Sequence, residues 1–322
     1  MGDGAWNGPI VDAHQHFWEP AVNNHPWLAP DARIPFRYGD YSAIKRRYLP
    51  DDYQNDAAGY NIVQTVYVET EWDPTDPVGE TRYASGIAAR FARPNAIVAQ
   101  AWLNRPDVAD VLAAQGAFPL VRSVRHKPEG PTAPDEVGTI STLMSDPIWR
   151  SGFALLATHG LAFDLQTPWW NLHEAVALAQ DFPDTAIILN HAGLPSQRDA
   201  DSLAAWRAAL ARFATCRNAV VKLSGIGVPG ERWTADSNGW IVRTAIDLFG
   251  ADRTMFASNF PVDSLCARFS EIADGFRTIL APLSRADQQA FFCDTARRVY
   301  RLADQSLVPS AIADRGAPDS AR

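Results

Sequence analysis

The sequence predicts an α/β fold, a (β/α)8 barrel of the TIM type, from three observations. Eight short apolar segments alternate along the chain with eight longer amphipathic segments. Most of the short segments are apolar throughout, as a parallel strand covered on both faces requires. No glycine-rich nucleotide-binding motif follows any of them, which disfavours an open doubly wound sheet. Eight consecutive units without an obvious linker therefore favour a closed barrel.

The elements are expected to follow one another in a regular order. Strands are expected at Ile10–Ala13, Gln64–Val68, Ile97–Trp102, Leu120–Val124, Ala162–Leu165, Ala186–Leu189, Val220–Leu223 and Met255–Ala257. Helices are expected at Asp51–Tyr60, Glu80–Phe91, Val108–Gln115, Pro147–His159, Asn171–Asp181, Ser202–Thr215, Asn238–Phe249 and Phe269–Leu280. An additional C-terminal helix is expected over Arg285–Leu302, where Phe291, Phe292 and Tyr300 would pack on the barrel.

Residues 1–303 are expected to form a single barrel domain. Residues 304–322, rich in small, charged and proline residues, are expected to form a loosely packed tail. The connection from Gln15 to Pro50 is far longer than the usual span of roughly two to six residues, and it contains Trp18, Trp27 and Phe36. A loop in this place would form either a lid over the barrel mouth or a satellite core, and both alternatives stay open.

The charge balance limits the kind of partner. The chain carries 29 Lys and Arg against 37 Asp and Glu, a net charge of −8. Without a basic face, the protein is not expected to bind nucleic acid or an anionic membrane. No apolar stretch reaches about 18 residues, and the N-terminus lacks a basic segment followed by an apolar run. We therefore expect a cytoplasmic protein that acts on a small molecule, with homo-oligomerisation left open.

Polar side chains at the strand ends would meet at one mouth of the barrel. Strand one ends in Asp12-Ala13-His14-Gln15-His16. Because strand side chains alternate between two faces, His14 and His16 should project to the same side, which a barrel makes its interior mouth. His191 follows strand six and would bring a third imidazole there. Imidazoles so placed can bind one divalent metal ion or donate hydrogen bonds to a substrate oxygen.

The other strand ends supply charged groups and amides. Strand four carries Arg122 and Arg125, whose guanidinium groups suit a carboxylate or a developing oxyanion. The remaining candidates are Glu69 after strand two, Asp164 in strand five, and Asn259 and Asp263 after strand eight.

Five segments, in order, resemble the lactonase branch of the amidohydrolase superfamily. They are Val11-Asp12-Ala13-His14-Gln15-His16, Val121-Arg122-Ser123-Val124-Arg125-His126, Phe163-Asp164-Leu165-Gln166, Asn190-His191-Ala192-Gly193-Leu194-Pro195 and Lys222-Leu223-Ser224-Gly225. This branch includes hydrolases of sugar-acid lactones, such as fuconolactone, and of 2-pyrone-4,6-dicarboxylate. The resemblance as a whole runs in family order from about Ile10 to Tyr300, nearly the whole chain.

The resemblance implies a barrel hydrolase that opens a carboxylated cyclic ester. His14, His16 and His191 would surround the scissile carbonyl, either around one divalent metal ion, zinc or manganese, or without a metal. The resemblance implies Arg122 and Arg125 as substrate-binding residues, and Trp18, Asn259 and Glu69 are further candidates for this role from their places near the expected mouth.

One position departs from the family pattern. Where the superfamily usually has an aspartate after strand eight, this chain has Asn259, and an amide cannot act as a carboxylate base. Asp263, Asp164 and His191 are therefore the candidate bases, and the missing carboxylate also weakens the case for a bound metal. Two other hypotheses stay open: a metal-assisted decarboxylase of an aromatic or unsaturated acid, which Asn259 disfavours, and a non-catalytic ligand-binding relative.

Overall fold

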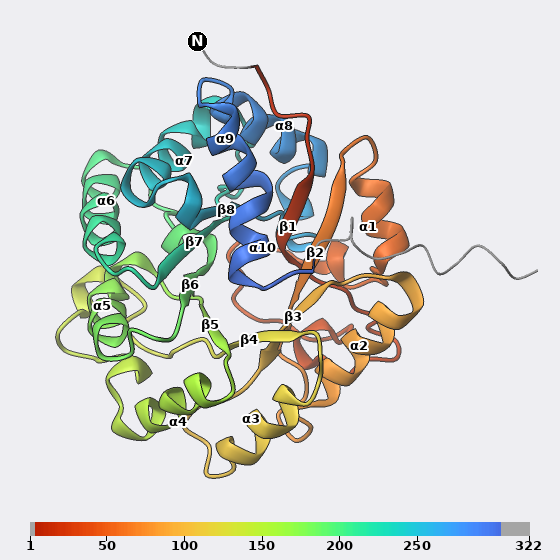
Figure 1. Cartoon of the computed structure of the whole chain (residues 1–322), viewed down its shortest axis with the longest axis vertical. Coiled ribbons are helices and arrows are strands. Elements are labelled where there is room, and N and C mark those ends of the chain that lie inside the picture. The colour runs from red at the N-terminus through yellow and green to blue at the C-terminus, as the bar shows by residue number, and fades with distance from the viewer. Residues whose placement is uncertain (1–3, 304–322) are drawn as a thin grey trace, which may run out of the picture.

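The computed structural model describes residues 4–303, and its eight strands form one parallel sheet in sequence order (Figure 1). The strands are β1 (Ile10–Gln15), β2 (Ile62–Val68), β3 (Ala96–Gln100), β4 (Val121–Arg125), β5 (Ala162–Leu165), β6 (Ile187–Leu189), β7 (Ala219–Leu223) and β8 (Thr254–Phe256). The first and last strands meet just past their C-terminal ends. There the His16 N–H donates to the Phe260 carbonyl (2.8 Å) and the Asn259 N–H donates to the His14 carbonyl (2.7 Å). The predicted barrel is confirmed, and it is nearly closed.

Helices surround the sheet (Figure 1). They are α1 (Pro50–Asp56), α2 (Gly79–Phe91), α3 (Val108–Gly116), α4 (Pro147–Thr158), α5 (Leu172–Asp181), α6 (Ala200–Ala214), α7 (Ala235–Phe249) and α8 (Phe269–Leu280). Each predicted helix is present, with ends displaced by a few residues. For example, α7 begins before the predicted Asn238 because the Thr234 hydroxyl accepts a hydrogen bond from the Ser237 N–H (3.0 Å) and caps the helix. No helix within residues 4–303 has the length and apolarity needed to cross a membrane.

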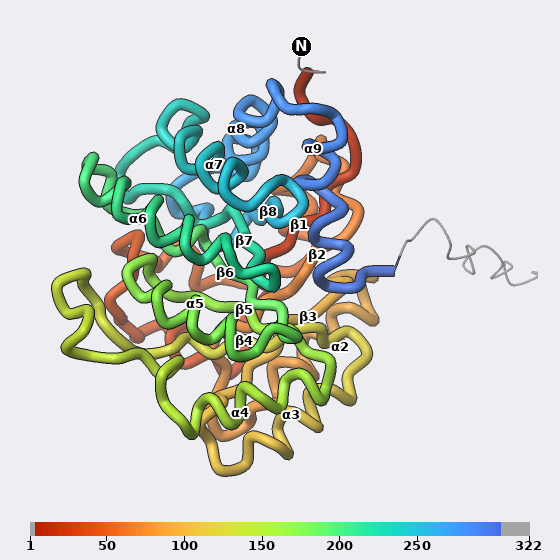
Figure 2. The backbone as a smooth tube through the Cα atoms, turned by 60° about the vertical axis from the view of Figure 1, so that its left-hand side comes forward, coloured from red at the N-terminus to blue at the C-terminus, as the bar shows by residue number. Residues whose placement is uncertain are grey.

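The additional C-terminal helix covers the N-terminal end of the barrel. It consists of α9 (Arg285–Gln289), a π-helical turn (Ala290–Asp294) and α10 (Thr295–Val299). Cys293, Ala296 and Tyr300 pack among the residues of the barrel interior. Arg297 donates a hydrogen bond to Gln64 near the start of β2 (2.9 Å). Figures 1 and 2 show this helix beside β1 and β8. The opposite end of the barrel is therefore the end left for a ligand. The predicted tail lies outside the described residues.

The long connection after β1 contributes side chains both to the hydrophobic core and to the barrel mouth. Trp18 and Tyr48 exchange two backbone hydrogen bonds (2.9 and 2.8 Å), and both side chains are fully buried in the main hydrophobic core between barrel and helices. Trp27 and Phe36 stack with ring centroids 5.9 Å apart, and both line a cavity at the C-terminal ends of the strands. The loop thus packs into the main core, without a separate satellite core among the described residues, and overhangs the mouth.

Candidate active site

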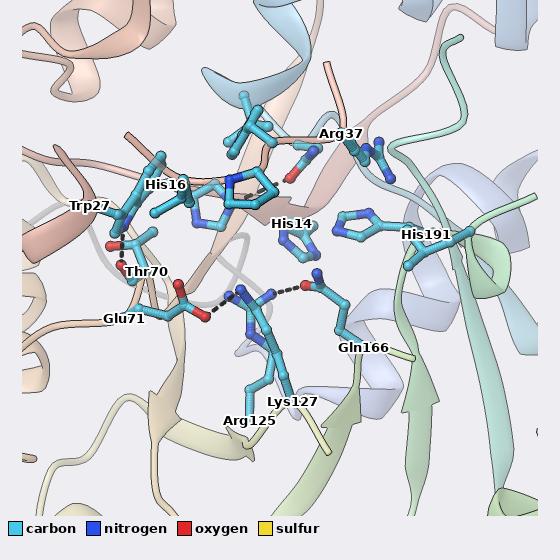
Figure 3. Close-up of a pocket in the computed structure, with 16 residues that line it drawn as sticks. His14, His16, Trp27, Arg37, Thr70, Glu71, Arg125, Lys127, Gln166 and His191 are labelled. Atoms are coloured by element: carbon cyan, nitrogen blue, oxygen red, sulfur yellow. Dashed lines mark hydrogen bonds and ion pairs between the residues drawn. The ribbon is translucent and has the colours of Figure 1, made fainter. Parts of the chain in front are cut away.

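A cavity of about 380 Å³ opens at the C-terminal end of the barrel (Figure 3). The residues that line it are His14, His16, Trp27, Ile34, Pro35, Phe36, Arg37, Thr70, Glu71, Arg125, Lys127, Gln166, His191, Leu194, Asn259 and Val262. Its volume falls within the range of roughly 300 to 1,000 Å³ that is typical of small-molecule sites. The lining combines several charged groups with an aromatic wall from the long loop.

Three histidines face this cavity together. The ring centroid of His14 lies 5.0 Å from that of His16 and 4.7 Å from that of His191. His14 and His16 share a face, as strand alternation predicts. All three side chains are almost completely buried, and Figure 3 shows their rings turned toward one another. The structure therefore brings together side chains from the two sides of the barrel.

The backbone after β6 is bent so that it presents His191. Residues 191–194 all have positive φ angles, between 51° and 71°, which is unfavourable for residues other than glycine. The Ser224 hydroxyl lies 2.8 Å from Nδ1 of His191 and orients the ring. At Gly225 a Cβ atom would lie only 2.6 Å from that same Nδ1, so the packed ring requires glycine there. Such local strain is concentrated at functional sites in many proteins.

His16 is held in one tautomer. Its Nδ1 lies 2.8 Å from the Val68 carbonyl oxygen, and because a carbonyl can only accept, Nδ1 carries the proton. Nε2 of the neutral ring therefore presents a lone pair, 3.3 Å from Oδ1 of Asn259. The indole of Trp18 stacks on the ring with centroids 5.9 Å apart. His16 is thus positioned to accept a hydrogen bond from water or substrate.

Burial lowers the pKa of all three histidines. The pKa of His16 falls to about 3, first through burial and then through the positive charge of Arg125. The pKa values of His14 and His191 also fall well below 6.5, mainly through burial and next through the charges of Lys222 and Arg37 respectively. Each ring is therefore neutral at pH 7, with one N–H donor and one lone pair.

The lowered pKa of His16 predicts a loss of stability in acid. Between pH 6.5 and about 3 the unfolded chain binds a proton at this ring that the folded protein does not bind. The free energy of unfolding therefore falls as the pH drops below 6.5, and this contribution is complete only above 6.5. At about pH 5 the expected loss is about 2 kcal/mol. Urea titrations at about pH 7.5 and 5 should show a smaller loss for His16→Asn than for the wild type. Equal losses would contradict a buried neutral ring.

Arg125 and Lys127 form one flank of the cavity. Arg125 is paired with the buried carboxylate of Glu69, and its Nη1 donates to Oε1 of Gln166 (2.9 Å). Lys127 forms an ion pair with Glu71 at 2.6 Å. Each cation thus has a carboxylate partner, which holds the positive charge in a fixed place beside the histidines.

Arg37 is a candidate that sequence reasoning missed. It lines the cavity from the long loop, donates to the Gly225 carbonyl and the Tyr38 hydroxyl, and lies 3.8 Å from the Asp263 carboxylate. No strand alternation places a residue in an irregular loop, so the pattern that found His14 could not find it. The available signal was only a basic residue among aromatic ones in an unusually long connection.

Five predicted site residues do not line the cavity: Trp18, Glu69, Arg122, Asp164 and Asp263. Arg122 faces away from the interior and donates to the carbonyls of Pro119 and Val121. It stands three positions before Arg125, and an odd separation in a strand places two side chains on opposite faces. The structure thus does not bring Arg122 to the site.

The other four lie behind residues that face the cavity. Trp18 packs on His16, and Glu69 pairs with Arg125. Asp164 lies deeper in the barrel, in a fully buried ion pair with Lys222 (2.6 Å). Of the three candidate bases, only His191 reaches the cavity directly.

Asn259 connects the cavity to Asp263. The amide presents Oδ1 to Nε2 of His16 and donates from Nδ2 to Oδ1 of Asp263 (2.7 Å). Asp263 also accepts from the Tyr38 hydroxyl and the Gly225 N–H, both at 3.0 Å. Burial raises the pKa of Asp263, and the nearby Arg37 guanidinium opposes this shift. Asp263 therefore acts on the cavity through the amide that it orients.

The donor set does not favour a tightly held divalent metal ion. Within residues 4–303, no three His, Cys, Asp or Glu side chains are arranged to hold one. Arg125 and Lys222 place positive charge near His14, and Asn259 stands where a carboxylate would offset it. In the described part of the chain both ring nitrogens of His14 are buried without a hydrogen-bond partner. The side chains themselves therefore carry the chemistry of the site, and His14 offers two unpaired ring nitrogens at its centre.

Comparison with known proteins finds relatives over nearly the whole chain. A family model described as Amidohydrolase matches residues 11–302. An uncharacterized protein of Sinorhizobium fredii is 39% identical over 299 residues, which cover 91% of this chain and 98% of that protein. An L-fucono-1,5-lactonase of Burkholderia multivorans is 28% identical over 304 residues, 91% of this chain and 96% of the lactonase.

Crystal structures of an amidohydrolase from Burkholderia multivorans have the same fold. The form with bound HEPES superposes with a TM-score of 0.76 at 26% identity, covering 92% of this chain and all of the other. The form with bound zinc superposes with a TM-score of 0.74. A relative with this barrel can therefore hold zinc.

Proposed function

The chain belongs to the amidohydrolase family and is a hydrolase of ester bonds, and we propose that it opens a carboxylated lactone at the histidine cavity. The observation that carries this proposal is the convergence of three neutral imidazoles on one cavity flanked by guanidinium groups. Neutral imidazoles can both donate and accept protons, as ester hydrolysis requires. The similarity to L-fucono-1,5-lactonases supports a lactone as the ester.

In the proposed reaction, His14 polarises the carbonyl. Its ring nitrogens have no partner among the described residues, so its N–H is available to the carbonyl oxygen as negative charge develops there. His191 takes a proton from water through Nε2, while Ser224 orients the ring through Nδ1. The hydroxide formed bonds to the carbonyl carbon, and the ring C–O bond then breaks. The leaving alkoxide takes the proton back from His191.

The charged residues suit an anionic substrate. Arg37 and Arg125 both line the cavity beside the histidines, and guanidinium groups bind carboxylates through paired hydrogen bonds. Nε2 of His16 and Oδ1 of Asn259 are two adjacent acceptors, and together they can receive a hydroxyl group of the substrate or the attacking water. A lactone that carries a carboxylate and a hydroxyl group would satisfy all of these groups.

A screen of lactones tests the proposal. Sugar-acid lactones and pyrone lactones would be incubated at about neutral pH with a pH indicator, with and without added Zn²⁺ or Mn²⁺. We expect acidification with at least one carboxylated lactone, and its loss in His191→Asn. The variant keeps the size of the side chain but lacks a basic ring nitrogen.

The outcomes separate three activities. Acidification that is equal for the wild type and His191→Asn would contradict the assigned base. Release of carbon dioxide in place of acid would indicate decarboxylation. Thermal stabilisation by a lactone without turnover would indicate a ligand-binding protein.

A further inference from the structure

A second cavity, of about 390 Å³, lies next to the histidine cavity. We call it the side compartment, and it is lined by the loops after β4, β5, β6 and β7, with Trp170, Pro131 and Ser196 among its residues. Arg37 and Leu194 line both cavities. The two cavities therefore adjoin at these two side chains.

Hydrogen bonds and close packing hold the side chains at the junction between the cavities. The Arg37 guanidinium is held by the Gly225 carbonyl and the Tyr38 hydroxyl. A Cβ atom at Gly225 would lie 2.7 Å from Nη2 of Arg37, so a glycine there leaves room for the arginine. Leu194 has a φ of 58° and ends the positive-φ run that begins at His191. The same bent segment thus presents the catalytic ring and one side of the junction.

The lining of the side compartment is rich in proline and largely uncharged. Five of its residues are prolines, and Trp170 supplies an indole. The Trp170 Nε1–H donates to the Pro131 carbonyl (2.9 Å), which ties the loop after β5 to the loop after β4. Arg37, at the junction, and Glu129, which is exposed, are the charged residues among those that line it. Proline and indole surfaces suit an apolar or aromatic ring better than an ion.

We propose that the side compartment binds an uncharged ring substituent of the substrate, while the lactone ring lies against the histidines and its carboxylate meets Arg37. The inference rests on the proposed lactone hydrolysis and deepens it, because it names the substrate as a carboxylated lactone with an aromatic or other apolar ring. The total volume supports this, since two adjoining cavities of similar size exceed what one small lactone fills. Ring burial in the side compartment contributes binding free energy that a small lactone lacks.

The test compares two substrates that differ by one ring. Initial rates would be measured for butyrolactone carboxylate and for the same compound with a phenyl group on its ring. We expect the wild type to prefer the phenyl compound by about tenfold or more in kcat/KM, since burying a ring of this size is worth at least that factor. Ser196→Trp places an indole in the compartment, and the preference should fall to about one. Trp170→Ala removes the aromatic wall and should also lower the preference.

The control is Gln197→Trp, which adds the same bulk at the next, exposed position outside both cavities. It should keep the wild-type preference. Equal kcat/KM values for both compounds in the wild type would overturn the inference and leave lactone hydrolysis intact. The same preference in the wild type and in all variants would do so as well. Loss of both activities in folded Ser196→Trp would show that this position obstructs the histidines, and would overturn a separate compartment. Hydrolysis of neither compound by the wild type would overturn the proposed function and the inference together.

Discussion

Replacing His14 with alanine is expected to lower kcat/KM by about 10² to 10⁴-fold and to leave the protein folded. The ring is buried at the centre of the three histidines, and both of its nitrogens lack a hydrogen-bond partner within the described residues. Removing it creates a cavity, which costs stability, but it also removes two unsatisfied polar atoms, which restores some. We therefore expect the free energy of unfolding to fall by less than about 2 kcal/mol.

His126 provides the matched control. It is also a nearly buried histidine, and burial lowers its pKa to about 4. Its Nδ1, however, accepts hydrogen bonds from the Leu103 N–H (3.1 Å) and the Trp149 Nε1–H (2.9 Å), away from the cavity. His126→Ala should therefore lower stability by more than His14→Ala does and leave kcat/KM nearly unchanged. Urea titration and lactone kinetics on both variants would measure this reversal. A His14→Ala enzyme that keeps its activity, or is the less stable variant of the two, would contradict the assigned role.

Strand alternation accounts for what the sequence could predict at the site, and it also explains why one predicted residue does not line the cavity. The rule placed His14 and His16 on one face, as found. Applied to strand four, the same rule separates Arg122 from Arg125, which had been grouped by their place at one strand end and by the resemblance. Periodicity assigns a face to each residue, and a local motif does not.

The sequence pattern could not predict how deep a side chain lies in the barrel or which path the long loop takes. Asp164 lies within β5, which ends at Leu165, whereas Gln166 follows the strand end and lines the cavity. Where a strand ends depends on its partners in the barrel, and the sequence does not show them. Arg37 reaches the site because Trp18 and Tyr48 fix the course of the long loop, and that packing is tertiary. The fold could therefore be predicted more completely than the site.

Replacing Lys222 with methionine is expected to lower the free energy of unfolding by about 3 to 5 kcal/mol. Its Nζ lies 2.6 Å from Oδ1 of Asp164, and both side chains are fully buried in the barrel. Without the ammonium group, Asp164 would keep neutral donors, the Tyr300 hydroxyl (3.0 Å) and Nδ2 of Asn190 (2.9 Å), but no positive partner of its own. An uncompensated buried carboxylate is costly. Urea titrations of the variant and the wild type at about pH 7.5 would measure this loss.

The variant Lys127→Met tests whether burial of an ion pair, and not the distance between its charges, sets the cost of removing the lysine. The Lys127–Glu71 ion pair has the same 2.6 Å separation as the Lys222–Asp164 pair, but its side chains are 38% and 47% exposed. Water solvates Glu71 when its partner is removed, so this substitution should cost less than about 1 kcal/mol. Adding Asp164→Asn to Lys222→Met should restore most of the lost stability, since the double variant leaves no buried charge unpaired. Equal losses of stability in the two lysine variants, or no recovery in the double variant, would contradict this. Either result would show that the packing of the Lys222 side chain, and not its charge, stabilises the barrel beneath the histidines.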